Sequence, residues 1–171
     1  MQGYAAIPKS ARVAMLSRMI EVDERFEVPA PPLTVWELLA DPHAVVGCVP
    51  GAAIVGEQPD GSFDTTLTVK FGPVGVAFQA RAVLELETHA MRGRLSARGK
   101  DKQGGARFEA TATFSVADNS SGPGAVVSMH GEVDISGPLA SLIEGGAGIV
   151  VKRMSAEFIS CLSTRAASTS I

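Results

Sequence analysis

The feature that most constrains the fold is the segment from residue 136 to residue 162, the only long stretch with apolar side chains at helical spacing. Steps of three and four residues separate the members of one apolar stripe: Leu139, Leu142, Ile143, Ile149, Val150, Met154, Phe158 and Leu162. Gly145, Gly146 and Gly148 interrupt the segment, and each costs about 1 kcal/mol against alanine in a helix. We therefore expect one amphipathic helix with a kink or a close backbone approach at its glycines.

The segments before this helix alternate between apolar and polar residues, as half-buried strands do. The alternation predicts strands at residues 20–28, 52–57, 62–71, 74–87, 91–100, 106–116 and 125–135. Short turns join most of them, which indicates an antiparallel meander. Two short helices are expected between the first and second strands, the later one capped by Asp41 and running over His43–Cys48. The long helix must then bury its stripe on the sheet, which gives an α+β fold.

Length and composition indicate one globular domain. The chain has 171 residues, of which 46% are hydrophobic and 19% charged. We assign residues 1–18 to an N-terminal extension, 19–165 to the domain and 166–171 to a C-terminal tail. A net charge of -3 gives no reason to expect a nucleic-acid partner. No apolar run approaches the ~20 residues of a membrane span, and residues 1–18 lack a secretory core, so we expect a cytoplasmic protein.

The chain has two cysteines, Cys48 and Cys161. Their number and spacing match neither a metal motif nor the disulfide framework of a small secreted domain. We therefore interpret them as two buried thiols.

The inward face of the predicted sheet carries many small side chains. By alternation they are Ala80, Ala82, Gly93, Ala97, Gly99, Ala106, Ala110, Ala112, Ala125 and Gly131. Protein interiors pack densely, so a sheet lined in this way leaves volume under the helix that suits an apolar occupant. The alternative is that small residues only let the sheet coil tightly and the helix sit close. Composition does not decide between the two.

Residues for catalysis are few. His43 begins the second short helix, His89 lies in a turn, and His130 lies on the solvent face beside Glu132. None shares a face with a cysteine or another histidine, so we expect no metal site. No phosphate-binding glycine loop, nucleophile elbow or pair of inward carboxylates is present. Glu24 alone breaks the apolar face of the first strand. It is either an end-of-sheet residue near water or a polar group at a cavity mouth, and we favour the first. We assign no catalytic residue.

Three motifs carry a resemblance to a known family. They are Val35-Trp36 through Asp41-Pro42 to Cys48-Val49-Pro50-Gly51, then Val69 to Val74 with Phe78 following, and Gly99 to Gly105 before a strand at Phe108. Over about residues 19–162 the chain resembles the G-subunit family of carbon monoxide dehydrogenase, within the START-like, birch-pollen-allergen-like helix-grip superfamily (SRPBCC). The resemblance implies a curved antiparallel sheet of about seven strands wrapped around a long C-terminal helix.

The resemblance also implies an accessory role rather than catalysis. Family members accompany molybdenum-containing dehydrogenases, assist their membrane association or electron delivery, and hold a quinone or lipid. It implies no covalent cofactor. It further implies a molybdenum hydroxylase complex as partner and peripheral contact with the inner face of the membrane.

On this interpretation, an apolar cavity lies between sheet and helix. We expect its wall to comprise Phe63, Leu67, Val69, Phe71, Phe78, Ala80, Ala82, Leu95, Ala97, Phe108, Ala110, Ala112, Met129, Leu142, Gly146, Ile149 and Val150. We expect its mouth to comprise Val46, Val49, Gly72 and Pro73.

Two other functions remain open from the sequence. A helix-grip enzyme of the polyketide cyclase or dehydratase type needs polar groups aimed into the cavity, and the candidates are Glu24, Cys48 and Arg81. A partner-binding subunit without a ligand would instead have a filled core.

Overall fold

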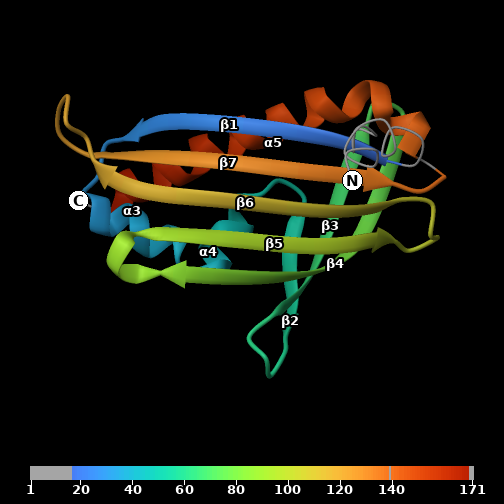
Figure 1. Ribbon diagram of the computed structural model, residues 1–171, viewed down its shortest axis with the longest axis horizontal. Helices are drawn as coiled ribbons and strands as arrows, with labels where there is room; N and C mark the ends of the chain where they lie inside the picture. Colours follow the sequence, from blue (N-terminus) through green and yellow to red (C-terminus); the bar gives the residue numbers. More distant parts are fainter. Residues whose placement is uncertain (1–16, 139, 170–171) are drawn as a thin grey trace, which may run out of the picture.

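A computed structural model of the protein describes residues 17–138 and 140–169, without the side chains of residues 17, 18, 74 and 141–144 (Figure 1). The predicted N-terminal extension lies outside this part, except for its last two residues. In chain order the elements are β1 (Ser17–Val28), α3 (Pro32–Leu39), α4 (Pro42–Gly47), β2 (Ala52–Glu57), β3 (Phe63–Phe71), β4 (Val74–Glu87), η1 (Thr88–Ala90), β5 (Arg92–Asp101), β6 (Arg107–Asp118), β7 (Ala125–Ser136) and α5 (Ala140–Thr169). The predicted α+β order is confirmed.

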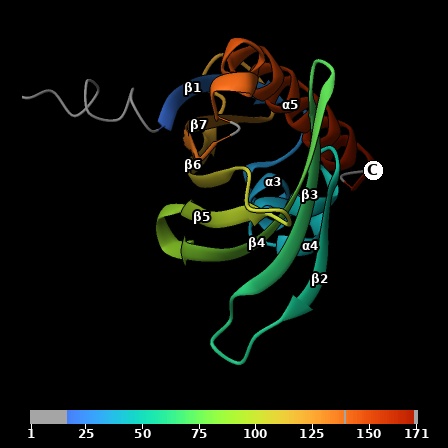
Figure 2. The same cartoon turned by 90° about the vertical axis from the view of Figure 1, so that its right-hand side faces the viewer.

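The strands form one antiparallel sheet in the order β1-β7-β6-β5-β4-β3-β2. β2 to β7 follow one another as the predicted meander, and β1 adds to the outer edge of β7 with Val28 opposite Ala125. Figure 2 shows the sheet curling from β1 round to β2, with α5 lying across the open side against β1 and β3. The predicted sheet wrapped around a C-terminal helix is therefore confirmed.

Helix α5 differs from the prediction at both ends. It begins at Ala140 rather than at residue 136, because β7 continues to Ser136 and Gly137 adopts a left-handed φ of 103° that ends the strand. It then continues through residues 166–169, which the sequence pattern places in a tail, and Ala166 is fully buried. Within the described residues, no helix has both the length and the apolarity needed to cross a membrane.

The glycines of α5 neither interrupt the helix nor meet another backbone closely. A Cβ built on Gly145 or Gly148 has nothing within 4 Å, and one on Gly146 lies 4.0 Å from the carbonyl carbon of Phe71, an ordinary contact. The predicted close approach is therefore wrong. The helix is assigned without a break through all three positions.

Two short helices lie together at one end of the curled sheet (Figure 1). Proline at the first position suits both α3 and α4, because its ring fixes a helical φ. The Asp41 carboxylate caps α4 as predicted, with Oδ1 accepting from the backbone N–H of His43 at 3.0 Å. Val35, Trp36 and Leu39 of α3 are buried under the sheet.

Among the described side chains, the core comprises two clusters. The first surrounds the two short helices and contains Val28, Ala30, Val35, Trp36, Leu39, Val45, Cys48, Phe114, Val116, Ala125, Val127, Phe158, Leu162 and Ala166. The second lies near the start of α5 and contains Val69, Phe71, Val76, Phe78, Ala106, Phe108, Ile135, Ala140, Ala147 and Val150. In the second, the rings of Phe78 and Phe108 meet edge to face with centroids 5.0 Å apart.

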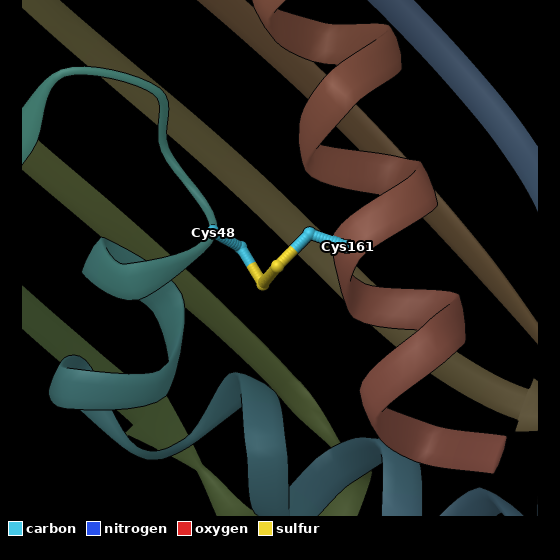
Figure 3. Close-up of a disulfide and its surroundings, with 2 residues drawn as sticks. All are labelled: Cys48 and Cys161. Carbon is cyan, nitrogen blue, oxygen red and sulfur yellow. A yellow bond between two sulfur atoms is a disulfide. The ribbon is translucent and has the colours of Figure 1, made fainter. Parts of the chain in front are cut away.

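Cys48 and Cys161 form a disulfide (Figure 3), so our interpretation of them as two buried thiols is wrong. Their Cα atoms lie 5.4 Å apart, within the usual range for a disulfide, although 113 residues separate them in sequence. Cys48 ends α4 and Cys161 belongs to α5, so only the packing of these helices brings the sulfurs together. The bond ties the segment after α4 to the long helix.

Candidate functional site

A cavity of about 250 Å³ lies between the inner face of the sheet and α5. Its sheet side comprises Val22, Leu84, Leu95, Ala97, Ala110, Thr111, Ala112, Phe114, Met129, Gly131 and Val133. Its helical side comprises Leu39, Val45, Val49, Val151, Met154, Ser155 and Phe158. Because these residues include members of the first core cluster and residues packed against each of the two, the cavity lies where the two clusters meet.

The space exists because small inward residues fall side by side on the central strands. Ala97 of β5 is paired with Ala110 of β6, and Ala112 of β6 with Gly131 of β7. None of the four has a side chain long enough to fill the space up to α5. A Cβ built on Gly131 would have only the Thr111 carbonyl oxygen nearby, at 3.7 Å, so this position is open.

Two other glycines on the inner face of the sheet leave no empty space beside them. A Cβ on Gly93 would lie 2.3 Å from Cζ of Phe114, and one on Gly99 would lie 2.7 Å from Cε2 of Phe108. Each of these glycines therefore gives an aromatic ring room to lie across its strand. Both explanations of the small inward residues therefore hold, at different positions. At some positions the small residue makes room for an aromatic ring, and at others it leaves empty space beneath α5.

The structure places five of the predicted wall residues around the cavity, together with one predicted mouth residue. The five are Leu95, Ala97, Ala110, Ala112 and Met129, and the sixth residue is Val49. Leu95, Met129 and Val49 pack against the first core cluster, whereas Ala97 and Ala110 pack against the second.

Most other predicted wall residues lie elsewhere. They are Phe63, Leu67, Val69, Phe71, Phe78, Ala80, Ala82, Phe108, Gly146 and Val150. For seven of them the physical reason is that they belong to the second core cluster or pack against it, so their side chains fill that part of the interior: Leu67, Val69, Phe71, Phe78, Ala80, Phe108 and Val150. The side chain of Leu142 lies outside the described ones.

Ile149 and the remaining mouth residues also require correction. Ile149 is 65% exposed, because Ala147 and Val150 occupy the buried face of this turn of α5. Gly72 and Pro73 form the exposed turn between β3 and β4, and Val46 is half-buried on α4 without lining the cavity.

Sequence reasoning missed the helical side of the cavity, apart from Val49. Val151, Met154, Ser155 and Phe158 line it from α5 at spacings of three, one and three residues. That is one face of a helix, so the signal was present. This face of α5 was missed for two reasons. Ser155 is polar, and the predicted apolar stripe included Ile149, which lies on another side of the helix. Leu39 and Val45 were missed because they lie on short helices whose faces have little periodicity.

The wall is apolar and holds no titratable side chain among its described residues. Thr111 alternates with Ala110 and Ala112, so its side chain points to the opposite face of the sheet. Ser155 is the remaining polar side chain, and its Oγ is buried without a hydrogen-bond partner. The shape and chemistry of such a cavity suit an apolar molecule, and its described lining residues include no acid or base.

The three candidate enzyme residues do not line the cavity. Cys48 is in the disulfide, and Arg81 lies on the outer face, where its Nη2 is 3.1 Å from Oδ1 of Asp64. Glu24 is half-buried opposite Met129 on the edge strand β1.

On the outer face of the sheet, His130 lies within hydrogen-bond distance of two carboxylates. His130 Nδ1 lies 2.7 Å from Asp23 Oδ1, and Nε2 lies 3.2 Å from Glu132 Oε2. These hydrogen bonds, first to Asp23 and then to Glu132, raise the pKa of His130 above its usual value. These three side chains lie on the outer face of the sheet and do not line the cavity. We therefore assign them to stabilising the sheet rather than to the candidate site.

Comparison with known structures shows which proteins share this fold. A conserved protein from Geobacillus kaustophilus is 15% identical, with a TM-score of 0.73 over 87% of this chain and 96% of that one. The ZhuI aromatase/cyclase from Streptomyces sp. R1128 is 17% identical, with a TM-score of 0.58 over 87% and 94% of the two chains. A START superfamily protein from Mycobacterium smegmatis is 16% identical, with a TM-score of 0.53 over 87% and 98%.

Comparison with curated protein sequences gave no match. The family model of CoxG, the G-subunit of carbon monoxide dehydrogenase, matches residues 25–167. The matched range runs from β1 to the last turns of α5 and includes every described residue that lines the cavity except Val22.

Proposed function

Because the chain belongs to the CoxG family of carbon monoxide dehydrogenase G-subunits, we propose that it is an accessory protein that binds a quinone or lipid in the cavity beneath α5. The observation that carries this proposal is the cavity of about 250 Å³ with its almost wholly apolar wall. An apolar cavity of this kind excludes charged molecules and favours an apolar occupant. The bound molecule is held without a covalent bond.

The proposed partner is a molybdenum-containing hydroxylase of the carbon monoxide dehydrogenase type. Membership of the CoxG family supports this association. The protein would assist the membrane association of that enzyme or its electron delivery, from a peripheral position at the inner face of the membrane. The Cys48–Cys161 disulfide is unusual for the reducing cytoplasmic side of a membrane, since disulfides persist mainly where conditions are oxidising, so the proposed location needs its own test. Cell fractionation with thiol trapping before lysis tests the location.

The first experiment asks what the protein carries. Protein purified under native conditions is extracted with organic solvent, and the extract is analysed by mass spectrometry. We expect an isoprenoid quinone or a lipid in stoichiometric amount. The proposal would be contradicted if the protein, purified from hosts that make isoprenoid quinones and lipids, never retains one of them.

A matched pair of variants on β6 localises the binding. Ala112→Leu adds a branched side chain inside the cavity, whereas Ala117→Leu adds the same atoms at an exposed position on the same strand. We expect Ala112→Leu to lose most of the bound compound and Ala117→Leu to keep it. Thermal unfolding checks that both variants are folded. Equal retention by both would place the compound outside the cavity.

The two rival functions have less support. Likeness to an aromatase/cyclase at 17% identity concerns the fold alone, and the cavity wall lacks the acid–base groups that such an enzyme needs. A partner-binding subunit with a filled core does not agree with the cavity.

A further inference from the structure

The cavity has one polar group that its surroundings leave unsatisfied. Ser155 lies on α5 among Val151, Met154 and Phe158, all of which line the cavity with it. Its Oγ is buried and has no hydrogen-bond partner. A serine inside a helix commonly donates to the carbonyl oxygen four residues earlier, which here belongs to Val151, but this hydroxyl makes no such bond.

A buried hydroxyl without a partner is costly, and native proteins satisfy nearly all such groups with protein or water. The wall residues of the sheet opposite α5 are alanine, glycine, valine, leucine, methionine and phenylalanine, apart from the outward Thr111, and their side chains cannot supply a partner. A polar group of a molecule bound in the cavity can supply the missing partner.

We infer that Ser155 is the hydrogen-bond donor that orients the bound molecule, and that this molecule places a ring carbonyl oxygen against it. The inference rests on the proposed function and adds the chemistry of the part that the cavity holds. The serine hydroxyl donates its proton to the carbonyl, and no covalent bond forms or breaks.

Chemistry selects a carbonyl over other polar groups. A carboxylate or phosphate would be buried without a cation, because no lysine, arginine or histidine lines the described wall. A hydroxyl or amine on the ligand would bring a donor of its own and require a second acceptor. A carbonyl accepts the Ser155 proton and leaves no donor unsatisfied.

Size selects a ring system rather than a whole lipid. Engineered apolar cavities of roughly 150 Å³ bind benzene, and this cavity measures about 250 Å³. It therefore suits a compound of about two fused rings. A long isoprenoid or acyl chain attached to such a ring would have to lie outside the cavity as the structure describes it.

Two probes and two variants test the inference. The probes are 1-tetralone, a two-ring ketone, and tetralin, the matched hydrocarbon. Ser155→Ala removes the hydroxyl in the cavity, and Ser160→Ala makes the same change at an exposed position of the same helix. Dissociation constants are measured by calorimetry or ligand-observed NMR on the full chain freed of any compound it carries.

We expect Ser155→Ala to weaken 1-tetralone binding about three- to tenfold, the effect of one neutral hydrogen bond, and to leave tetralin unchanged within about twofold. Ser160→Ala should change neither. The melting temperature of ligand-free protein gives a second readout. It should rise more in Ser155→Ala than in Ser160→Ala, because both gain helix propensity but only the first loses an unsatisfied hydroxyl.

A Ser155→Ala variant that binds 1-tetralone as tightly as the unaltered protein, or that weakens both probes equally, would overturn the inference. So would an unaltered protein that binds neither probe. The proposed function is judged separately by the compound found in native extracts. If a quinone or lipid is retained but Ser155→Ala does not change 1-tetralone binding, this inference alone is overturned.

Discussion

At the scale of single residues, two inward glycines on different strands have opposite surroundings. Gly93 lies against the ring of Phe114, with no room for a Cβ, whereas Gly131 faces the open cavity. Phe114 in turn packs on Trp36, with ring centroids 6.1 Å apart. Phe114 thus belongs to the first core cluster and also lines the cavity.

This contrast gives a prediction for alanine substitution. Gly93→Ala should lower the free energy of unfolding by about 1–3 kcal/mol, because the new methyl group displaces the Phe114 ring. Gly131→Ala should change it by less than about 0.5 kcal/mol, because the methyl group enters open space. Urea titrations followed by the fluorescence of Trp36, the only tryptophan, measure both. Equal losses in the two variants would contradict the account of Phe114.

His130 gives a prediction about pH. Its pKa is raised by the hydrogen bonds to Asp23 and Glu132, so the protonated form is favoured in the folded protein. The stabilisation is fully present below the unfolded pKa of about 6.5 and is lost as pH rises through the higher folded pKa. His130→Gln should remove this part of the pH dependence of the melting temperature.

The control for this prediction is His89→Gln, at an exposed position in η1 that has no such pair of carboxylate partners among the described contacts. It should leave the pH profile unchanged. An NMR titration placing the pKa of His130 at or below that of an unfolded peptide would contradict the assignment.

At the scale of elements, the disulfide joins the end of α4 to α5 next to the cavity wall. Val45 and Val49, which lie on either side of Cys48 in sequence, line the cavity, as does Phe158, one turn before Cys161. Figure 3 shows the bond crossing from the segment after α4 to the long helix. The bond therefore fixes the distance between two sides of the same wall.

Removing the disulfide should destabilise the fold and loosen this wall. The double variant Cys48→Ser, Cys161→Ser should lose about 3–5 kcal/mol of unfolding free energy, because the bond closes a loop of over a hundred residues. Guanidinium titrations with and without a dithiol reductant measure the loss. The reductant should mimic the double variant in the unaltered protein and have no effect on the variant itself. Full stability under reductant, with both thiols shown to be free, would contradict this role.

At the scale of the whole molecule, one curled sheet and one helix enclose an interior that side chains fill only in part. The second core cluster packs the half near the start of α5, and the first packs the half near the short helices. The unfilled space remains where small residues of β5, β6 and β7 lie beneath the middle of α5. Binding is thus assigned to the junction of two well-packed regions, which hold the wall in place.

The sequence alone determined the order of helices and strands and which side chains of each strand point inward. This is because the spacing of apolar residues, two in a strand and about 3.6 in a helix, is a local property. That is why Ala97, Ala110 and Ala112 were correctly placed on the inner face and why Asp41 was recognised as a cap. Only the tertiary structure decided which inward positions are filled, because an alanine beside a buried ring and one opposite α5 look alike along the chain. The Cys48–Cys161 bond and the exposure of Ile149 were decided in the same way, by contacts between segments that no local pattern connects.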